Sequence, residues 1–187
     1  MVFGNPFMFA ILVERVAEWN DSESEDNGHF AFCIKGEVFP KSIINTPYII
    51  ALKNALKALK NEPRKEVLMN DWIREAYETI YHRVYPDEEI SKDWNSLYSL
   101  YDELSDDLAD ESFYIFTVKR DNKTVFMAVE YTVDIETQTD ILGDKVITTE
   151  VDADEIDMIV REMENFICTE ELRVHGKKET EEYGTED

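Results

Sequence analysis

Residues 7–13 read FMFAILV and residues 30–34 read FAFCI, and these two stretches decide the fold. Apolar side chains alternate along both in the pattern of a β-strand, and the positions between them are largely apolar as well. A strand with two apolar faces is expected inside a sheet, with the rest of the chain packed around it. Between the two stretches lies DSESEDNG, residues 21–28, which is too polar to bury and rich in turn-forming residues. We therefore predict an antiparallel hairpin.

The second half of the chain contains three more segments with strand character. Residues 112–118 and 123–133 form a predicted second hairpin, and residues 146–151 read as a further strand. Residues 135–145 are polar, so we expect a loop there.

Helical periodicity of apolar residues is present in four segments. Thr46 and Pro47 are typical of an N-cap and a first helical position, and residues 152–155 have the capping-box pattern. The expected helices are residues 46–61, 70–86, 91–109 and a helix that follows residue 155. The last one is expected to bury Ile156, Ile159, Val160, Met163, Phe166 and Ile167.

Together these segments predict an α+β fold, with a mostly antiparallel sheet of about five strands and about four helices. A chain of 187 residues with one run of such elements suits a single domain, which we place at residues 1–169. Residues 170–187 lose the periodicity and are poor in apolar side chains, so we expect a disordered acidic tail.

Negative charge is the strongest feature of the composition, and it is unevenly distributed. The formal net charge is −23. Residues 1–86 hold 10 Lys or Arg against 12 Asp or Glu, a net −2, whereas residues 87–187 hold 9 against 30, a net −21. A field of this sign repels nucleic acids and anionic membranes and attracts basic partners. The alternative is that the charge only keeps the protein in solution.

Two acidic groups are candidate partner-binding residues. The first lies on the polar side of the expected helix at 91–109 and consists of Asp102, Glu103, Asp106, Asp107 and Asp110. The second surrounds the capping-box pattern and consists of Glu150, Asp152, Asp154 and Asp157. Like charges this dense weaken a helix by a few tenths of a kcal/mol for each i,i+4 pair, which suggests that the acidic face has a use.

Signals for enzymatic chemistry are weak. The three histidines, His29, His82 and His175, have no zinc-ligand spacing, and the six glycines form no phosphate-binding loop. We expect no cofactor and no metal, and we expect Cys33 and Cys168 to be reduced thiols. Residues 1–20 do not resemble a signal peptide, and no apolar run reaches membrane-spanning length, so the expected location is the cytoplasm.

The opening of the chain resembles a bacterial family called immunity protein 42. The similarity lies in MVFGNPFMFAI, in EWN at residues 18–20 and in GHFAFCIKGEVFP at residues 28–40. It is carried by Phe3, Gly4, Pro6, Phe7, Phe9, Ala10, Ile11, Trp19, Asn20, Gly28, Phe30, Phe32, Ile34, Gly36 and Pro40. The resemblance implies a non-enzymatic antidote that binds and neutralises a toxin domain from a contact-dependent or polymorphic toxin system.

The resemblance and the charge favour the same kind of partner. A toxin domain that is a nuclease needs a basic surface to hold its substrate, and an acidic protein could cover that surface. The alternative hypothesis is an acidic adaptor or nucleic-acid mimic that blocks a DNA-binding protein of the host. A third is a small enzyme of unrecognised type. The sequence leaves the toxin's chemistry and the oligomeric state open.

Overall fold

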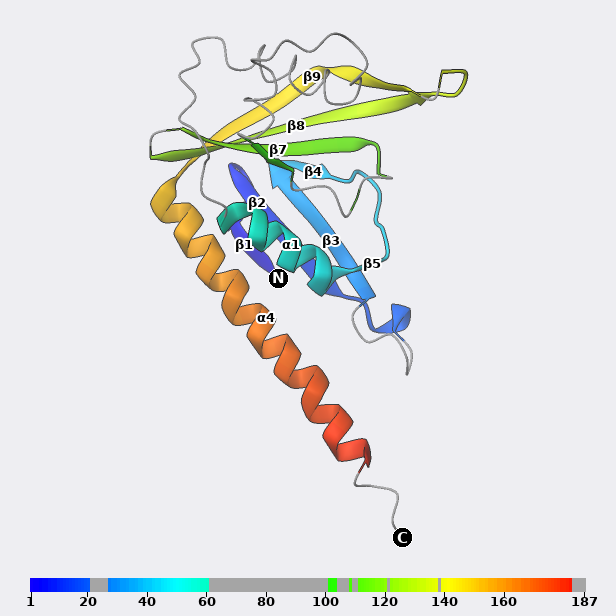
Figure 1. The fold of residues 1–187 in the computed structure, drawn as a ribbon, viewed down its shortest axis with the longest axis vertical. Coiled ribbons are helices and arrows are strands. Elements are labelled where there is room, and N and C mark those ends of the chain that lie inside the picture. The colour runs from blue at the N-terminus through cyan, green and yellow to red at the C-terminus, as the bar shows by residue number, and fades with distance from the viewer. Residues whose placement is uncertain are drawn as a thin grey trace, which may run out of the picture.

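The computed structural model describes residues 1–20, 27–60, 101–103, 108, 111–120, 122–137 and 139–182. This part of the chain forms two antiparallel sheets and two α-helices (Figure 1). The α+β class is therefore confirmed. The strands divide between two sheets where we expected one, and the described residues contain two α-helices where we expected about four.

The first sheet is built by the N-terminal residues. Its strands are β1 (Val2–Asn5), β2 (Phe9–Arg15), β3 (Asn27–Ile34) and β4 (Glu37–Phe39), in that order, and the short β5 (Thr46–Pro47) also pairs with β3. The predicted hairpin is β2 and β3, with Ile11 opposite Phe32. Because β2 lies between β1 and β3 and both Ala10 and Ile11 are fully buried, its predicted interior position is confirmed.

A two-residue turn joins β3 to β4 and keeps the sheet compact. Lys35 and Gly36 both have positive φ, 52° and 82°. Turns of this kind match the right-handed twist of the two strands that they connect. The turn also contacts the connection between β1 and β2, where the carbonyl of Pro6 accepts a hydrogen bond from the backbone N–H of Gly36 at 2.9 Å.

The second sheet contains β6 (Tyr101–Glu103), β7 (Phe113–Arg120), β8 (Lys123–Asp134) and β9 (Thr139–Asp152), in that order. The predicted hairpin of β7 and β8 is confirmed. The loop expected at residues 135–145 is wrong from Thr139 onward, because β9 begins there and pairs with the end of β8. Polar side chains did not prevent this pairing, since the ladder is made by backbone groups.

Part of the helix expected at residues 91–109 is also wrong. Tyr101–Glu103 is strand β6, paired with β7 from Val118 to Phe116. Pairing with a neighbouring strand here overrides a helical period in the sequence. Residues 91–100, and the whole helix expected at 70–86, lie outside the described residues.

The two α-helices of the described residues are α1 (Tyr48–Lys60) and α4 (Ala153–Glu182), and a 3-10 turn, η1 (Ala17–Trp19), follows β2. Helix α1 begins later than expected, because Thr46 pairs with Gly28 instead of capping the helix. Helix α4 was expected to follow residue 155, and it begins slightly earlier, at Ala153, inside the capping-box pattern of residues 152–155. Of its expected apolar residues, Ile156, Ile159, Met163 and Ile167 are buried, while Val160 and Phe166 are partly buried.

Helix α4 continues through Glu182, well beyond residue 170. The disorder expected for residues 170–187 remains a prediction, and residues 183–187 lie outside the described part. Neither α-helix in the described residues is both long enough and apolar enough to cross a membrane.

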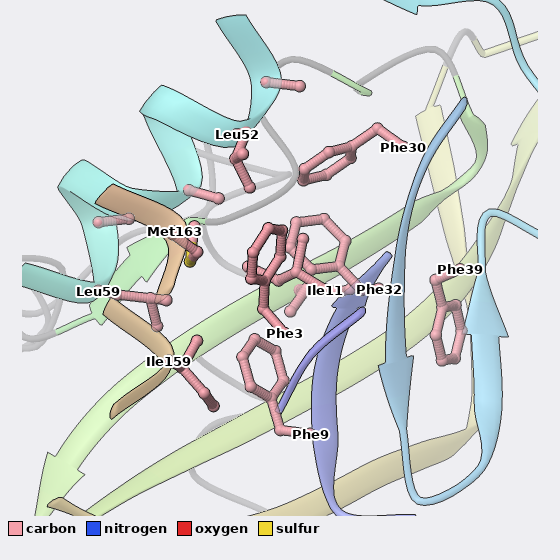
Figure 2. Close-up of a cluster of buried hydrophobic side chains, with 14 of the residues drawn as sticks. Phe3, Phe9, Ile11, Phe30, Phe32, Phe39, Leu52, Leu59, Ile159 and Met163 are labelled. Atoms are coloured by element: carbon pink, nitrogen blue, oxygen red, sulfur yellow. The ribbon is translucent and has the colours of Figure 1, made fainter. Parts of the chain in front are cut away.

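Both helices pack on one face of the first sheet, and aromatic rings join the layers. The Phe3 ring contacts the Phe166 ring of α4 edge-on at 5.5 Å. Figure 2 shows the core side chains of the sheet gathered beside Leu52, Leu59 and Met163 of the helices. The second sheet meets the end of the first through Phe9, which stacks on Phe126 of β8 with ring centroids 3.6 Å apart.

Candidate partner-binding surface

Most of the basic side chains that the structure describes form ion pairs with carboxylates. On α1, the Nζ atoms of Lys53 and Lys60 lie 2.6 Å from carboxylate oxygens of Glu171 and Glu164 on α4. The other ion pairs join Lys41 to Glu37 and Glu130, Lys123 to Glu150, Lys145 to Glu37, and Arg173 to Glu170. Two lysines of α1 are therefore neutralised by carboxylates of α4.

Glu37 takes part in two of these ion pairs. It accepts hydrogen bonds from both Lys145 of β9 and Lys41, and these bonds hold the pKa of its carboxyl below the ordinary value. The pair with Lys145 links β4 of the first sheet to β9 of the second. Two of the described cations are thus used to tie the sheets together, which leaves the outer surface with an excess of acids.

The second predicted acidic group forms a cluster where β9 passes into α4. Glu150 and Asp152 are exposed on the end of β9, and Asp154 and Asp157 are exposed on the first two turns of α4. We call these four residues the junction cluster. Acids at a helix N-terminus stabilise the helix through its dipole, so local structure alone accounts for some of them. Glu150 is paired with Lys123, whereas the exposure of the other three residues leaves their carboxylates available to a basic partner.

The first predicted acidic group is not placed on one helix face. Asp102 and Glu103 lie on β6, opposite Thr117 and Phe116 of β7. Asp106, Asp107 and Asp110 lie outside the described residues. Asp102 and Glu103 therefore do not lie on a helix, and the expected helical face does not include them.

A cleft of about 680 Å³ opens between the end of β4 and the second sheet. Its walls combine aromatic rings with three carboxylates and one lysine. They are formed by Phe39, Lys41, Ser42, Glu111, Ser112, Phe113, Glu130, Tyr131, Thr132, Ile141, Gly143 and Asp144.

Lys41, the lysine that lines the cleft, already interacts with neighbouring side chains. The Lys41 ammonium lies 4.5 Å above the Phe39 ring and 3.8 Å from a carboxylate oxygen of Glu130. Ser42, the residue after Lys41, donates its hydroxyl to the Glu111 carboxylate at 3.2 Å. Three acids against one paired lysine give the cleft a negative potential, which suits a cationic side chain.

Sequence reasoning missed this cleft. Its walls come from four separate segments, and no pattern along the chain brings them together. One signal was present: residues 130–144 contain five acids and no Lys or Arg. In the described residues, no group of three or more His, Cys, Asp or Glu side chains is arranged to hold a metal ion.

A buried polar contact ties the two helices together away from the cleft. The hydroxyl of Tyr48 on α1 donates to the Glu170 carboxylate on α4 at 3.1 Å, and Arg173 donates to the same oxygen at 2.9 Å. Burial, and then the charge of Glu170, raise the pKa of Tyr48 to about 12. The tyrosine is fully buried, so this arrangement is structural.

Comparison with known protein families gives a match. A family model described as immunity protein 42 matches residues 1–166, which is most of the chain. No curated protein matches the chain, and no solved structure does.

Proposed function

Because the chain belongs to the immunity protein 42 family, we propose that it is an antidote that binds a cognate bacterial toxin domain. Binding would cover the active or substrate-binding surface of the toxin and so protect the cell that makes it. The observation that carries this proposal is the family match, which extends over both sheets and the first half of α4.

The charge distribution supports a basic toxin domain as the partner. The described lysines are largely paired within the molecule, while the junction cluster and the cleft leave carboxylates exposed. Opposite charge on two proteins steers their encounter and raises the association rate. A nuclease domain, which needs a cationic surface for its substrate, fits such a field.

The test is co-expression with the toxin domain encoded next to this chain. We expect growth to be restored and a stable one-to-one complex to be recovered by size-exclusion chromatography. A catalytically inactive toxin domain serves for the binding measurement, so that toxicity does not limit expression. Failure both to restore growth and to bind would reject the proposal.

A second candidate is the acidic adaptor or nucleic-acid mimic, favoured only by the net charge of −23. Such a protein would bind a DNA-binding protein of the host in the absence of any toxin. Competition separates the two hypotheses: a mimic displaces DNA from that host protein, whereas an antidote restores growth only in the presence of its toxin.

A further inference from the structure

Strands β8 and β9 continue beyond the rest of the second sheet as a two-stranded arm, visible on the right of Figure 1. Pairing of β7 with β8 ends at Phe113 and Glu130, whereas β8 and β9 stay paired up to Asp134 and Thr139. The register shifts at Glu130, where the arm leaves the sheet. We call residues 131–137 and 139–142 the β8–β9 arm.

The tip of the arm is held in one conformation by a side chain. The Asp134 carboxylate accepts hydrogen bonds from the backbone N–H groups of Glu136 and Thr137, at 2.8 and 3.2 Å. An Asp in this position replaces a backbone turn contact. These bonds favour the turn conformation of the tip before a partner binds, and a loop that is partly pre-ordered loses less entropy on binding.

Three large apolar side chains of the arm are exposed. Val133 is 49% exposed, Ile135 at the tip 85%, and Ile141 54%. An isolated two-stranded ribbon is only marginally stable in water, and contact with a further surface would stabilise this one. Ile141 pairs with Thr132 and Val133 pairs with Asp140, so Ile141 lies on the cleft face of the arm, Val133 lies on the other face and Ile135 lies at the tip.

The arm and the cleft form one continuous surface. Thr132 and Ile141 are opposite each other on the arm, and both also line the cleft. Two of the cleft's carboxylates, Glu130 and Asp144, stand at the root of the arm. Over residues 130–144 the chain carries five acids and no base, so the segment that carries the exposed apolar side chains is itself negatively charged.

We propose that this surface docks the cognate toxin domain, with Ile135 and Ile141 as apolar anchors and the cleft as a socket for a Lys or Arg of the toxin. The inference rests on the proposed function and adds the place of binding. Charge complementarity favours a basic toxin domain as the occupant over a second copy of this chain. A second copy of this chain would bring an equally acidic arm against the first, and like charges would oppose that contact.

The experiment measures binding of an inactive toxin domain by isothermal titration calorimetry. The arm variant carries Ile135→Ser and Ile141→Thr, and the cleft variant carries Glu130→Gln and Asp144→Asn. The matched controls are Ile50→Ser on α1 and Leu172→Ser on α4, which remove apolar side chains that are 54% and 70% exposed elsewhere. Thermal unfolding of each variant shows whether it remains folded.

We expect the arm variant to bind about 30-fold more weakly, the effect of losing interface anchors. The cleft variant is expected to bind about 10-fold more weakly and to lose part of the salt dependence of binding. Both controls should bind as the wild type does, and the arm variant should also protect growth less well.

The outcomes separate this inference from the function on which it rests. If the wild type binds and protects and both the arm and cleft variants do so equally well, the docking surface is wrong and the antidote function stands. If the wild type neither binds nor protects, the function itself fails. A wild-type dimer that the arm variant loses would assign the arm to self-association and overturn the inference.

Discussion

At the scale of single residues, Gly28 shows how closely the first sheet is packed. A Cβ added there would lie 2.3 Å from the carbonyl oxygen of Glu14 and 2.8 Å from the ring of Tyr48. The carbonyl belongs to the backbone of β2 and cannot turn away. A side chain at this position therefore forces β2 and β3 apart.

We predict that Gly28→Ala lowers the free energy of unfolding by roughly 3 kcal/mol, because of overpacking. Gly36→Ala is the matched control. A Cβ there meets only the Phe7 ring at 3.9 Å, so the strain of a positive φ is the main effect, about 1 kcal/mol. Urea unfolding of both variants tests the prediction, and equal losses would contradict it.

Tyr48 gives a prediction that depends on pH. Its folded pKa of about 12 lies above the ordinary value of 10.0, so between these values the hydroxyl ionises in the unfolded chain and stays protonated in the folded one. Rising pH then favours unfolding. The stability that this tyrosine contributes is complete below pH 10 and falls by about 2 kcal/mol as the pH approaches 12.

Tyr48→Phe removes both the hydrogen bond to Glu170 and this titration. We predict that the variant is less stable than the wild type by about 1–2 kcal/mol at pH 8, and that the difference shrinks or reverses by pH 11.5. Urea unfolding at the two pH values measures it, and the direct comparison cancels the titration of all other groups. A difference that does not change with pH would show that Tyr48 titrates normally.

At the scale of elements, the sequence predicted those segments whose own side chains determine their structure. The alternating apolar residues of β2 and β3 need burial on a sheet, and the capping-box pattern starts α4 through local hydrogen-bonding capacity. The elements that it missed depend on a neighbour. Strand β6 forms beside β7, and the polar first half of β9 forms beside the end of β8. Backbone pairing of that kind leaves little trace in side-chain periodicity.

Helix α4 contains a boundary that truncation can locate. A chain ending at Arg173 keeps the contacts of Glu170 and Glu171 with α1, whereas a chain ending at residue 169 loses them. We predict that the first truncation changes the free energy of unfolding by less than about 0.5 kcal/mol and that the second lowers it by about 1–2 kcal/mol. Equal stability of both would mean that the contact between Tyr48 and Glu170 contributes nothing.

At the scale of the whole molecule, the sequence indicated the sign of the surface but not its shape. The negative field follows from composition, and the exposure of Asp152 and Asp154 follows from the predicted start of α4. The cleft does not follow, because it requires two separate sheets whose contact is made by Phe9 with Phe126 and Phe39 with Phe113. Pairing of distant aromatic residues cannot be read from one sequence.

The field predicts how association with the toxin domain responds to salt. Between about 20 and 150 mM ionic strength we expect the association rate to fall by roughly tenfold, because steering between exposed charges is screened. The dissociation rate should change much less. Stopped-flow or surface plasmon resonance measurements check this. A rate that is insensitive to salt would reject electrostatic steering and leave the antidote function untouched.

The first sheet packs against α4, so the core of a newly synthesised chain can be completed only after α4 has been made. Phe3 and Ile11 leave the ribosome at the start of synthesis, whereas Ile159 and Met163, which pack in the same core, come near its end. At roughly 5–20 residues per second, the interval from residue 39 to residue 167 lasts about 6–25 s. During that time the aromatic side chains of the nascent sheet lack the α4 residues that pack against them in the folded protein. If the protein is the antidote proposed above, the molecules that were folded before the toxin arrives provide the first protection, because molecules made afterwards need this additional time.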